Sequence, residues 1–426
     1  MESRMVGLIP RVLRARTLSI ESKMILLSLI VNSGEATSLR IWAIALRISD
    51  NTLKSALDDL LALECITKEH KKSSSPRGET KYFVQAQKTE KLLAPTITQG
   101  ENKRSSLRGS IETFVKETLG QKLNTSRSEK DRKCELLPVN LILFAIFLVH
   151  SDELGIVDKL SKADLKKLTG YTADKLNSQL KKLVRIGVLS LRVSGLSKSL
   201  LVGKVKSIYF LNLTHDAFKC YEYELVQYKY VFLGMNRNVF LKSIGECEKS
   251  VTDKTVLNEF SGKALSNFFE KLRELFNEMT RGEASYIQAK SEHLITMFLY
   301  HERLDIPLAI DLSLEKKLQN WLNMRTNLFP KISFDTENVS DQSEDKENNG
   351  EAKLALVNIV ITHAMIRFLT FLKTKKFEDM CDKESKLSSD TVWRFVQVNR
   401  AEANAKSSSS PFVKLEKYTC SPRTIN

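Results

Sequence analysis

The sequence predicts a mainly α chain of the α+β type, in which helices dominate and a few short strands accompany them. Three observations predict this class. A pattern of two helices joined by a turn occurs twice, 123 residues apart and without a gap. Each copy follows an apolar helical segment and precedes two β-prone runs. From Thr252 onward the apolar spacing is again helical. A chain of 426 residues suggests about two to four domains.

The two copies coincide in their apolar positions, although few residues are identical. The first runs from Ser38 to Ile66 and reads SLRIWAIALRISDNTLKSALDDLLALECI; the second runs from Ser161 to Leu189 and reads SKADLKKLTGYTADKLNSQLKKLVRIGVL. The coinciding residues are Trp42 with Leu165, Leu53 with Leu176, Leu57 with Leu180, Leu60 with Leu183 and Leu63 with Ile186. A pattern kept in phase across two helices and their turn indicates one supersecondary unit used twice.

In the first copy, residues 19–32 have helical apolar spacing, and Ser38 is placed to cap a second helix. Ser49 or Asp50 is placed to cap a third helix, because Ser and Asp accept hydrogen bonds from the first helical amides. Residues 65–84 contain two β-prone runs around the polar tip SSSPRG and predict a hairpin.

The second copy repeats this order. Residues 139–150 predict an apolar first helix, and Ser161 and Thr172 are placed to cap the second and third helices. Gly187 is placed to end the third helix, because glycine tolerates the left-handed backbone of a helix C-terminus. Residues 188–213 predict a second hairpin.

Three helices followed by a hairpin, with phrases such as ADLKKLTGYTADKLNSQLKKLVRIGVLSL, resemble the winged helix-turn-helix family of bacterial DNA-binding proteins. The resemblance covers residues 17–85 and 138–213, so it implies two tandem winged-helix domains followed by a helical C-terminal domain. Family members act as transcription regulators, as replication initiators or as protein-docking modules. The first copy departs from the pattern at Glu64, where a glycine commonly ends the third helix.

The chain organisation that follows has seven parts. They are a basic arm (1–18), winged helix 1 (19–85), a linker (86–137), winged helix 2 (138–213), a connecting segment (214–250), a helical domain (251–405) with a disordered acidic loop (335–351), and a flexible tail (406–426). A short helix is predicted near 111–119 within the linker, and further helices are predicted near 283–303, 312–328, 352–375 and 391–405 within the helical domain.

The positive charge is confined to the half of the chain that carries the repeat. The net charge is +15, and residues 1–220 contain 37 Lys and Arg against 22 Asp and Glu, whereas the remainder contains 29 of each. This segregation indicates a half that binds a polyanion and a neutral half. In such a unit the third helix enters the major groove, the wing reaches an adjacent groove or the backbone, and Lys and Arg contact phosphates.

The third helix of the second copy is basic, whereas that of the first carries Asp58 and Asp59 where the second has Lys181 and Lys182. We therefore expect the second copy to be the stronger groove reader. We expect the first copy either to bind DNA through its arm and its wing or to serve mainly in the pairing of chains. The predicted DNA-binding residues are Lys175, Ser178, Lys181, Lys182, Arg185, Arg192, Lys198, Lys204, Lys206, Lys54, Lys71, Lys72 and Arg77.

No motif of an enzyme is found. The sequence contains neither a GxxxxGK[ST] phosphate loop nor HExxH, and its six cysteines form no CxxC pair. His293 and His301 are eight residues apart but have no third ligand at metal-binding spacing. We therefore expect no enzyme activity, no cofactor and no metal. Because the sequence has no long apolar run, we expect that the chain is neither exported nor membrane-spanning. The expected location is the cytoplasm, in association with the nucleoid.

The leading functional hypothesis is a sequence-specific protein that binds double-stranded DNA, as a bacterial or mobile-element transcription regulator. A replication initiator that binds an origin is the alternative, and a protein-docking scaffold without DNA contact is the third. The C-terminal half carries an apolar stripe that must be buried within a helical bundle or in a homodimer. Its residues are Leu257, Phe260, Leu265, Phe268, Leu272 and Phe276.

Overall fold

The computed structural model describes most of residues 7–212 and several later segments. The earlier ranges are 7–32, 39–71, 79–93, 108–120, 137–152, 154–197 and 205–212, and the later ones are 221–230, 280–301, 391–398 and 412–422, with a few single residues between. The chain divides into two compact units, which are Met1–Arg192 with Tyr209–Glu222 and Ser421–Asn426, and Val193–Ile208 with Tyr223–Cys420. The described part is mostly helical with small antiparallel sheets, in agreement with a mainly α or α+β chain.

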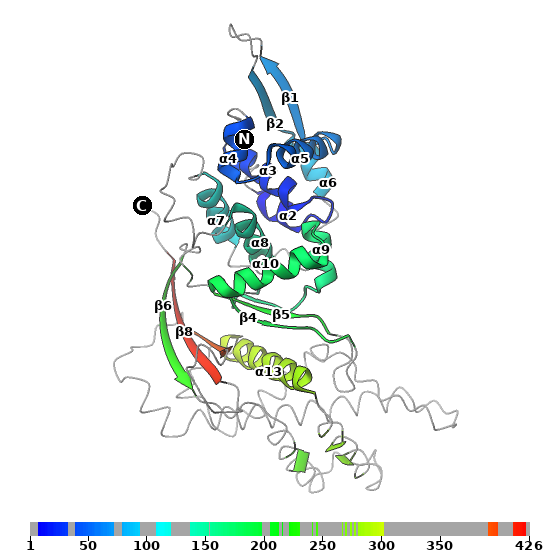
Figure 1. Ribbon diagram of the computed structural model, residues 1–426. Helices are drawn as coiled ribbons and strands as arrows, with labels where there is room; N and C mark the ends of the chain where they lie inside the picture. The colour runs from blue at the N-terminus through cyan, green and yellow to red at the C-terminus, as the bar shows by residue number, and fades with distance from the viewer. Residues whose placement is uncertain are drawn as a thin grey trace, which may run out of the picture. The chain divides into compact units, whose positions relative to one another are not determined.

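The first unit starts with helices and then a hairpin (Figure 1). Its first elements are α2 (Ile9–Arg14), α3 (Ile20–Val31), α4 (Leu39–Leu46), α5 (Asp50–Ala62), β1 (Ile66–Lys71) and β2 (Glu79–Val84). Ser19 caps α3 and Ser49 caps α5, each hydroxyl accepting a hydrogen bond from the amide three residues on, at 3.0 and 3.1 Å. The strands pair antiparallel, with Ile66 opposite Val84. The predicted cap Ser38 lies outside the described residues.

The second copy has the same order with one short strand added. Its elements are α8 (Pro138–His150), β3 (Ile156–Val157), α9 (Lys162–Thr169), α10 (Ala173–Ile186), β4 (Leu189–Val193) and β5 (Ile208–Leu211). The strands are ordered β3-β5-β4. Ser161 caps α9 in a reciprocal capping box with Asp164, and Thr172 caps α10. Gly187 ends α10 with a φ of 85°, so the predicted caps and the predicted stop of this copy are confirmed.

The offset of 123 residues holds in the backbone as well as in the sequence. Helices α4 and α9 begin and end at equivalent residues. The backbone is left-handed at Arg47 and Gly170, with φ of 52° and 70°, and again at Glu64 and Gly187, with φ of 54° and 85°. The Glu64 amide donates to the carbonyl three residues back at 2.9 Å, and the Gly187 amide does the same at 3.0 Å. The two helix-turn-helix segments therefore have the same local structure.

The left-handed end of each third helix leads to a stability prediction. Glu64→Gly should raise the free energy of unfolding by about 0.5–1 kcal/mol, because a residue with a Cβ is strained at positive φ. The ion pair of Glu64 with Lys88, at 2.8 Å, is exposed and contributes little. Gly187→Ala should lower the same quantity by about 1–2 kcal/mol through strain alone, since an added Cβ would meet nothing closer than His215 at 4.0 Å. Urea unfolding of both variants measures the two changes in the free energy of unfolding. Changes of the same sign would contradict the structural equivalence of positions 64 and 187.

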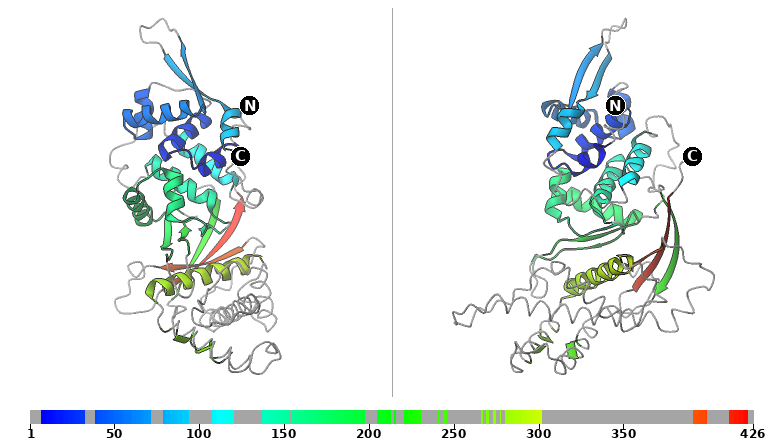
Figure 2. Two further views of the ribbon diagram at one scale, coloured as in Figure 1. Left: turned by 90° about the vertical axis from the view of Figure 1, so that its right-hand side faces the viewer. Right: turned by 180° about the vertical axis from the view of Figure 1, so that it is seen from behind.

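Helices of both copies share one core, shown from two more sides in Figure 2. Helix α8 is buried throughout from Leu141 to Val149, and α3 packs against α5, α8 and α7 (Arg108–Gly120). Each large apolar side chain removed from water contributes roughly 1.5–3 kcal/mol. Eight residues of the predicted repeat pattern are at most 3% exposed, namely Trp42, Leu53, Leu57, Leu60, Leu165, Leu176, Leu180 and Leu183. The predicted core of the repeat is confirmed at these eight positions, whereas Leu63 and Ile186 are half-buried.

The basic arm predicted for residues 1–18 is wrong where the structure describes it. Helix α2 is packed against α3, α7 and α8, and its Ile9, Val12 and Leu13 are fully buried. Arg11 forms an ion pair with Glu90 at 2.8 Å. The physical reason is the spacing of the apolar residues between the arginines, which places them on one face of a helix. Residues 1–6 lie outside the described part.

The linker predicted for residues 86–137 is wrong at Ala86–Leu93, which forms a packed helix, whereas the short helix predicted near 111–119 is confirmed by α7. Helix α6 (Ala86–Leu93) follows the hairpin, and the Thr89 hydroxyl donates to the Cys65 carbonyl at 3.2 Å. Helix α7 buries Ile111, Phe114 and Val115. The Phe114 ring meets the Phe144 ring edge-on, with 5.5 Å between centroids. The apolar residues of α7 are few, and their burial against α8 stabilises the helix.

The second unit contains a sheet and a helix. Its described elements include β6 (Tyr221–Tyr230), α13 (Arg281–His301), β7 (Thr391–Val398) and β8 (Phe412–Pro422), with the strand order β6-β8-β7 and α13 packed against β7. The predicted helix near 283–303 is confirmed. The predicted helix at 391–405 is wrong at 391–398, where TVWRFVQV is rich in β-branched and aromatic residues and forms a strand. The flexible tail is wrong at 412–422, which pair with β7.

Several predictions for this half fall outside the described residues. These are the six residues of the apolar stripe, the helices near 312–328 and 352–375, and the acidic loop 335–351. The connecting segment 214–250 contains the strand β6, which its sequence left ambiguous between helix and strand. Among the described residues, no helix is long and apolar enough to cross a lipid bilayer.

Candidate nucleic-acid interface

Helix α10 has one buried and one exposed face. Leu176, Leu180 and Leu183 are at most 1% exposed and hold the helix on the core. The opposite face carries Ser178 and Lys181, both exposed, at spacings that the helical period places above one another. Arg185, one turn further on, is exposed as well. The structure therefore brings three of the predicted DNA-binding residues together on one accessible helix face.

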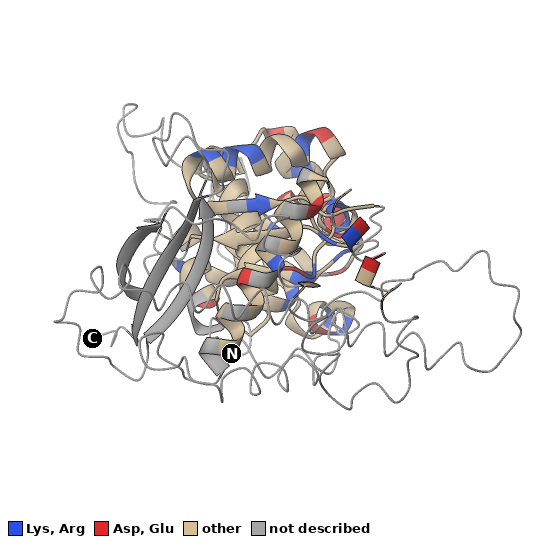
Figure 3. Cartoon of the chain, turned by 90° about the horizontal axis from the view of Figure 1, so that it is seen from below, with Lys and Arg blue, Asp and Glu red and all other residues tan. Residues whose placement is uncertain are grey.

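The positive charge of α10 is concentrated in its C-terminal half. Lys181 and Arg185 are exposed there and Lys182 is half-buried, whereas the acidic residue of the helix, Asp174, lies in its first turn. Figure 3 colours the basic and acidic residues of the described elements. Cations near a helix C-terminus are favoured by the helix dipole, so this arrangement stabilises the helix while it presents charge to solvent. Replacement of these exposed cations should weaken the binding of a polyanion more than it destabilises the fold.

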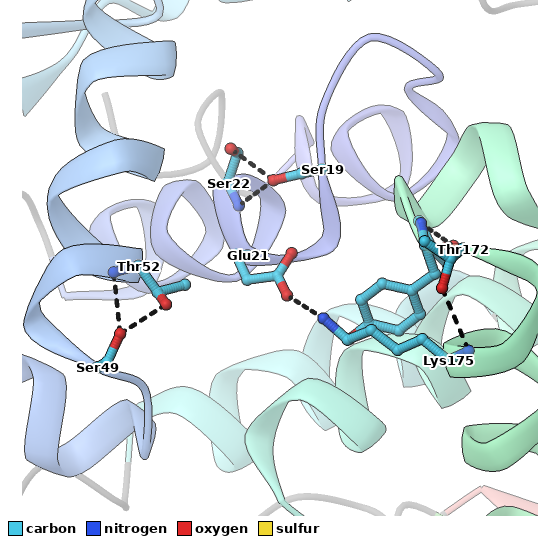
Figure 4. A network of polar contacts seen from close by, with 9 residues as sticks. Ser19, Glu21, Ser22, Ser49, Thr52, Thr172 and Lys175 are labelled. Carbon is cyan, nitrogen blue, oxygen red and sulfur yellow. Dashed lines mark hydrogen bonds and ion pairs between the residues drawn. The ribbon is translucent and has the colours of Figure 1, made fainter.

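Lys175 is engaged within the protein. Its ammonium lies 3.1 Å from the Glu21 carboxylate on α3 and 4.0 Å from the centroid of the Tyr171 ring (Figure 4). Burial, helped by the negative charge of Glu21, raises the pKa of the Tyr171 phenol above its ordinary value. A phosphate would have to compete with Glu21 for Lys175. Among the predicted residues of α10, Lys175 is therefore the one tied to the first copy.

Further contacts join the second copy to the N-terminal segment and to the start of α3. Arg16 lies 3.4 Å from the Asp164 carboxylate, and the Arg14 guanidinium donates to the Val149 carbonyl at 3.2 Å. A Cβ added to Gly170 would lie 3.4 Å from the Cβ of Ser19, so glycine permits close approach there as well as a φ of 70°. Both copies belong to the same compact unit, and these contacts fix the start of α10 relative to α3.

A buried lysine lies in the same junction. Lys23 is fully buried, and its ammonium donates to the carbonyl of Leu13 at 3.2 Å and to that of Leu168 in α9. Burial lowers the pKa of Lys23 from 10.5 to about 7. Through its two hydrogen bonds, the Lys23 side chain bridges the N-terminal segment, at Leu13, to the second copy, at Leu168. This role could not be predicted from the sequence, because Lys23 belongs to an ordinary apolar helix and the Leu168 carbonyl is 145 residues away.

The other predicted site residues are more dispersed. Lys54 is exposed on α5, Lys71 ends β1, and Arg192 on β4 is half-buried. Lys206 is exposed and belongs to the second unit. Four predicted residues lie outside the described part, namely Lys72, Arg77, Lys198 and Lys204. The polar contact that sequence reasoning missed at this site is that of Glu21 with Lys175, for which no local signal exists at a separation of 154 residues.

In the described part of the chain, no three His, Cys, Asp or Glu residues are grouped so as to hold a metal ion. His293 is buried on α13, in the second unit. The exposed face of α10 presents hydroxyl, ammonium and guanidinium groups to solvent. Comparison of the chain with protein-family models, with curated proteins and with solved structures finds no match.

Proposed function

We propose that the chain is a sequence-specific protein that binds double-stranded DNA, with α10 as its principal recognition helix. The observation that carries the proposal is the exposed face of α10, where Ser178, Lys181 and Arg185 are presented on a helix whose opposite face is anchored in the core. A helix of this kind fits the major groove of B-DNA. The excess of basic residues in the same half of the chain supports the proposal.

We further propose that both copies are winged-helix domains. In the second copy, the order α8, β3, α9, α10, β4, β5 and the sheet order β3-β5-β4 support this assignment. In the first copy, α3, α4, α5 and the hairpin of β1 and β2 follow the same sequence of elements. The wing of such a domain contacts the DNA backbone or an adjacent groove beside the recognition helix.

The two halves of α10 are suited to different contacts with DNA. Lys181 and Arg185 are long cations that reach phosphate oxygens, and these contacts supply affinity without sequence information. Ser178 lies nearer the N-terminus of the helix, where a small hydroxyl donates to or accepts from base edges. Sequence preference should therefore depend on the N-terminal half of α10 and salt dependence on its C-terminal half.

The proposal is tested by selection of duplexes from a random-sequence pool with the full chain. We expect a reproducible preferred sequence, bound at least about a thousandfold more tightly than unrelated duplex at physiological salt. A pool that stays random after repeated rounds, or a full chain that binds no duplex at all, would contradict the proposal and favour a protein-docking role.

A further inference from the structure

Two exposed positions near the start of the third helices correspond between the copies. At the offset of 123 residues, Asn51 of α5 corresponds to Asp174 of α10, and Ser55 corresponds to Ser178. All four side chains are exposed, and Ser49 and Thr172 cap the two helices equivalently. The N-terminal half of α5 is thus presented as that of α10 is, with a small hydroxyl at the same position.

The cations of the first copy lie in a different part of its helix-turn-helix segment. Where α10 has Lys181 and Lys182 in its C-terminal half, α5 has the exposed acids Asp58 and Asp59. The first copy instead has three exposed cations before or near the start of α5, one on α4, one in the turn and one on α5 itself. They are Arg40, Arg47 and Lys54, at positions where the second copy has Ala163, Gly170 and Asn177.

The acids of α5 are separated from this cationic end of the helix. Asp58 follows Asn51 by seven positions, which is about 10 Å along a helix axis. This separation is comparable to the Debye length, about 8 Å at physiological ionic strength, so salt screens much of the acids' effect on a phosphate near the start of the helix. The acids disfavour phosphate at one end of α5 and leave the other end accessible to DNA.

Arg47 keeps its side chain at a backbone conformation that favours glycine. Its φ is 52°, and the second copy has glycine at the equivalent position, with a φ of 70°. A residue with a Cβ costs about 1 kcal/mol or more in the left-handed region. A strained residue retained in the turn that precedes a recognition helix points to a role for its side chain. The exposed guanidinium is suited to a bidentate contact with phosphate.

We infer that the start of α5 is a second DNA-reading surface, in which Arg47 contacts phosphate and Asn51 reads adenine. The amide of Asn pairs bidentately with N6 and N7 of adenine in the major groove. Ser55 lies one turn further along the same exposed face and contacts the neighbouring base. This inference rests on the proposed function and extends it, because the target is then a composite site that both copies read.

The test compares Arg47→Gly with Glu64→Gly in the full chain. Both substitutions relieve the same backbone strain at an exposed left-handed residue, one in the turn before α5 and one after its end. Arg47→Gly should unfold at the same or a higher urea concentration than the wild type, yet bind the selected duplex more weakly. Its logarithmic salt slope should be smaller by about one. Glu64→Gly should gain the same stability and keep the affinity of the wild type.

Base reading is tested by repeating the duplex selection with Asn51→Ala. The wild-type pool should contain an adenine whose selection the variant loses, a change of about tenfold in discrimination at that position. If the wild type selects no sequence, the proposed function itself fails. If the wild type selects a sequence and Asn51→Ala keeps every base preference, or Arg47→Gly keeps the affinity and the salt slope, the inference is overturned while the proposed function stands.

Discussion

Replacement of Lys181, Lys182 and Arg185 by alanine is expected to weaken duplex binding about a hundredfold at physiological salt. Each cation that neutralises a phosphate releases a counterion, so loss of three such contacts should also reduce the logarithmic salt slope by about three. Alanine favours helices, and two of the three side chains are exposed, so α10 should stay folded. Binding titrations at several salt concentrations measure the affinity and the slope together.

A charge-matched variant separates the α10 face from general basicity. Lys88, Lys91 and Lys116 are exposed on α6 and α7, and their replacement by alanine removes the same three charges. We expect this variant to keep most of the wild-type affinity. Equal losses in the two triple variants would mean that net charge alone governs binding and that α10 has no special role.

The stability of the protein is expected to increase between pH 7 and pH 10 because of Lys23. Burial lowers the pKa of this residue to about 7 in the folded chain, whereas its value is 10.5 when unfolded. Between these pH values the unfolded chain binds a proton that the folded chain does not, so the free energy of unfolding rises with pH. The increase is about 1.4 kcal/mol for each pH unit within the window.

Lys23→Met lacks this titration and is the matched control. The other ionisable groups are common to both proteins, so the difference between the two pH profiles isolates Lys23. Urea unfolding at pH 7.5 and 9.5 should show a gain for the wild type, relative to Lys23→Met, of about 2–3 kcal/mol. Parallel profiles would mean that the Leu13 and Leu168 carbonyls hold the ammonium charged despite its burial, and Lys23→Gln provides a second comparison.

The sequence predicted the repeated segment well because its determinants are local. The spacing of Leu53, Leu57 and Leu60 defines a helix face, and Ser49 caps the helix through an amide three residues away. The exposed positions follow from the same period once the buried ones are known, which is why Ser178, Lys181 and Arg185 lie on one exposed face of α10. Gly187 was placed correctly because glycine relieves the strain of a left-handed residue.

The failures share a different cause, which is contact between residues far apart in the chain. The arginines of the N-terminal segment suggested a free arm, but burial of Ile9 and Val12 against distant helices outweighs their charge. Helix α6 was likewise predicted as part of a linker, and its Thr89 hydroxyl donates to the Cys65 carbonyl 24 residues away. The contact of Lys175 with Glu21 could not be predicted either, because only the junction of the two copies brings Glu21 near this helix.

The most direct test of the DNA-binding face of α10 places a photoreactive amino acid at position 178 and follows its crosslinks to the selected duplex. Ser178 lies on the exposed face, whereas Lys116, exposed on α7, serves as the control position. We predict that position 178 crosslinks to bases within the selected site and that position 116 does not. Crosslinking from position 116 alone, or none from position 178 under conditions where the duplex is bound, would contradict the assignment of α10 as the recognition helix.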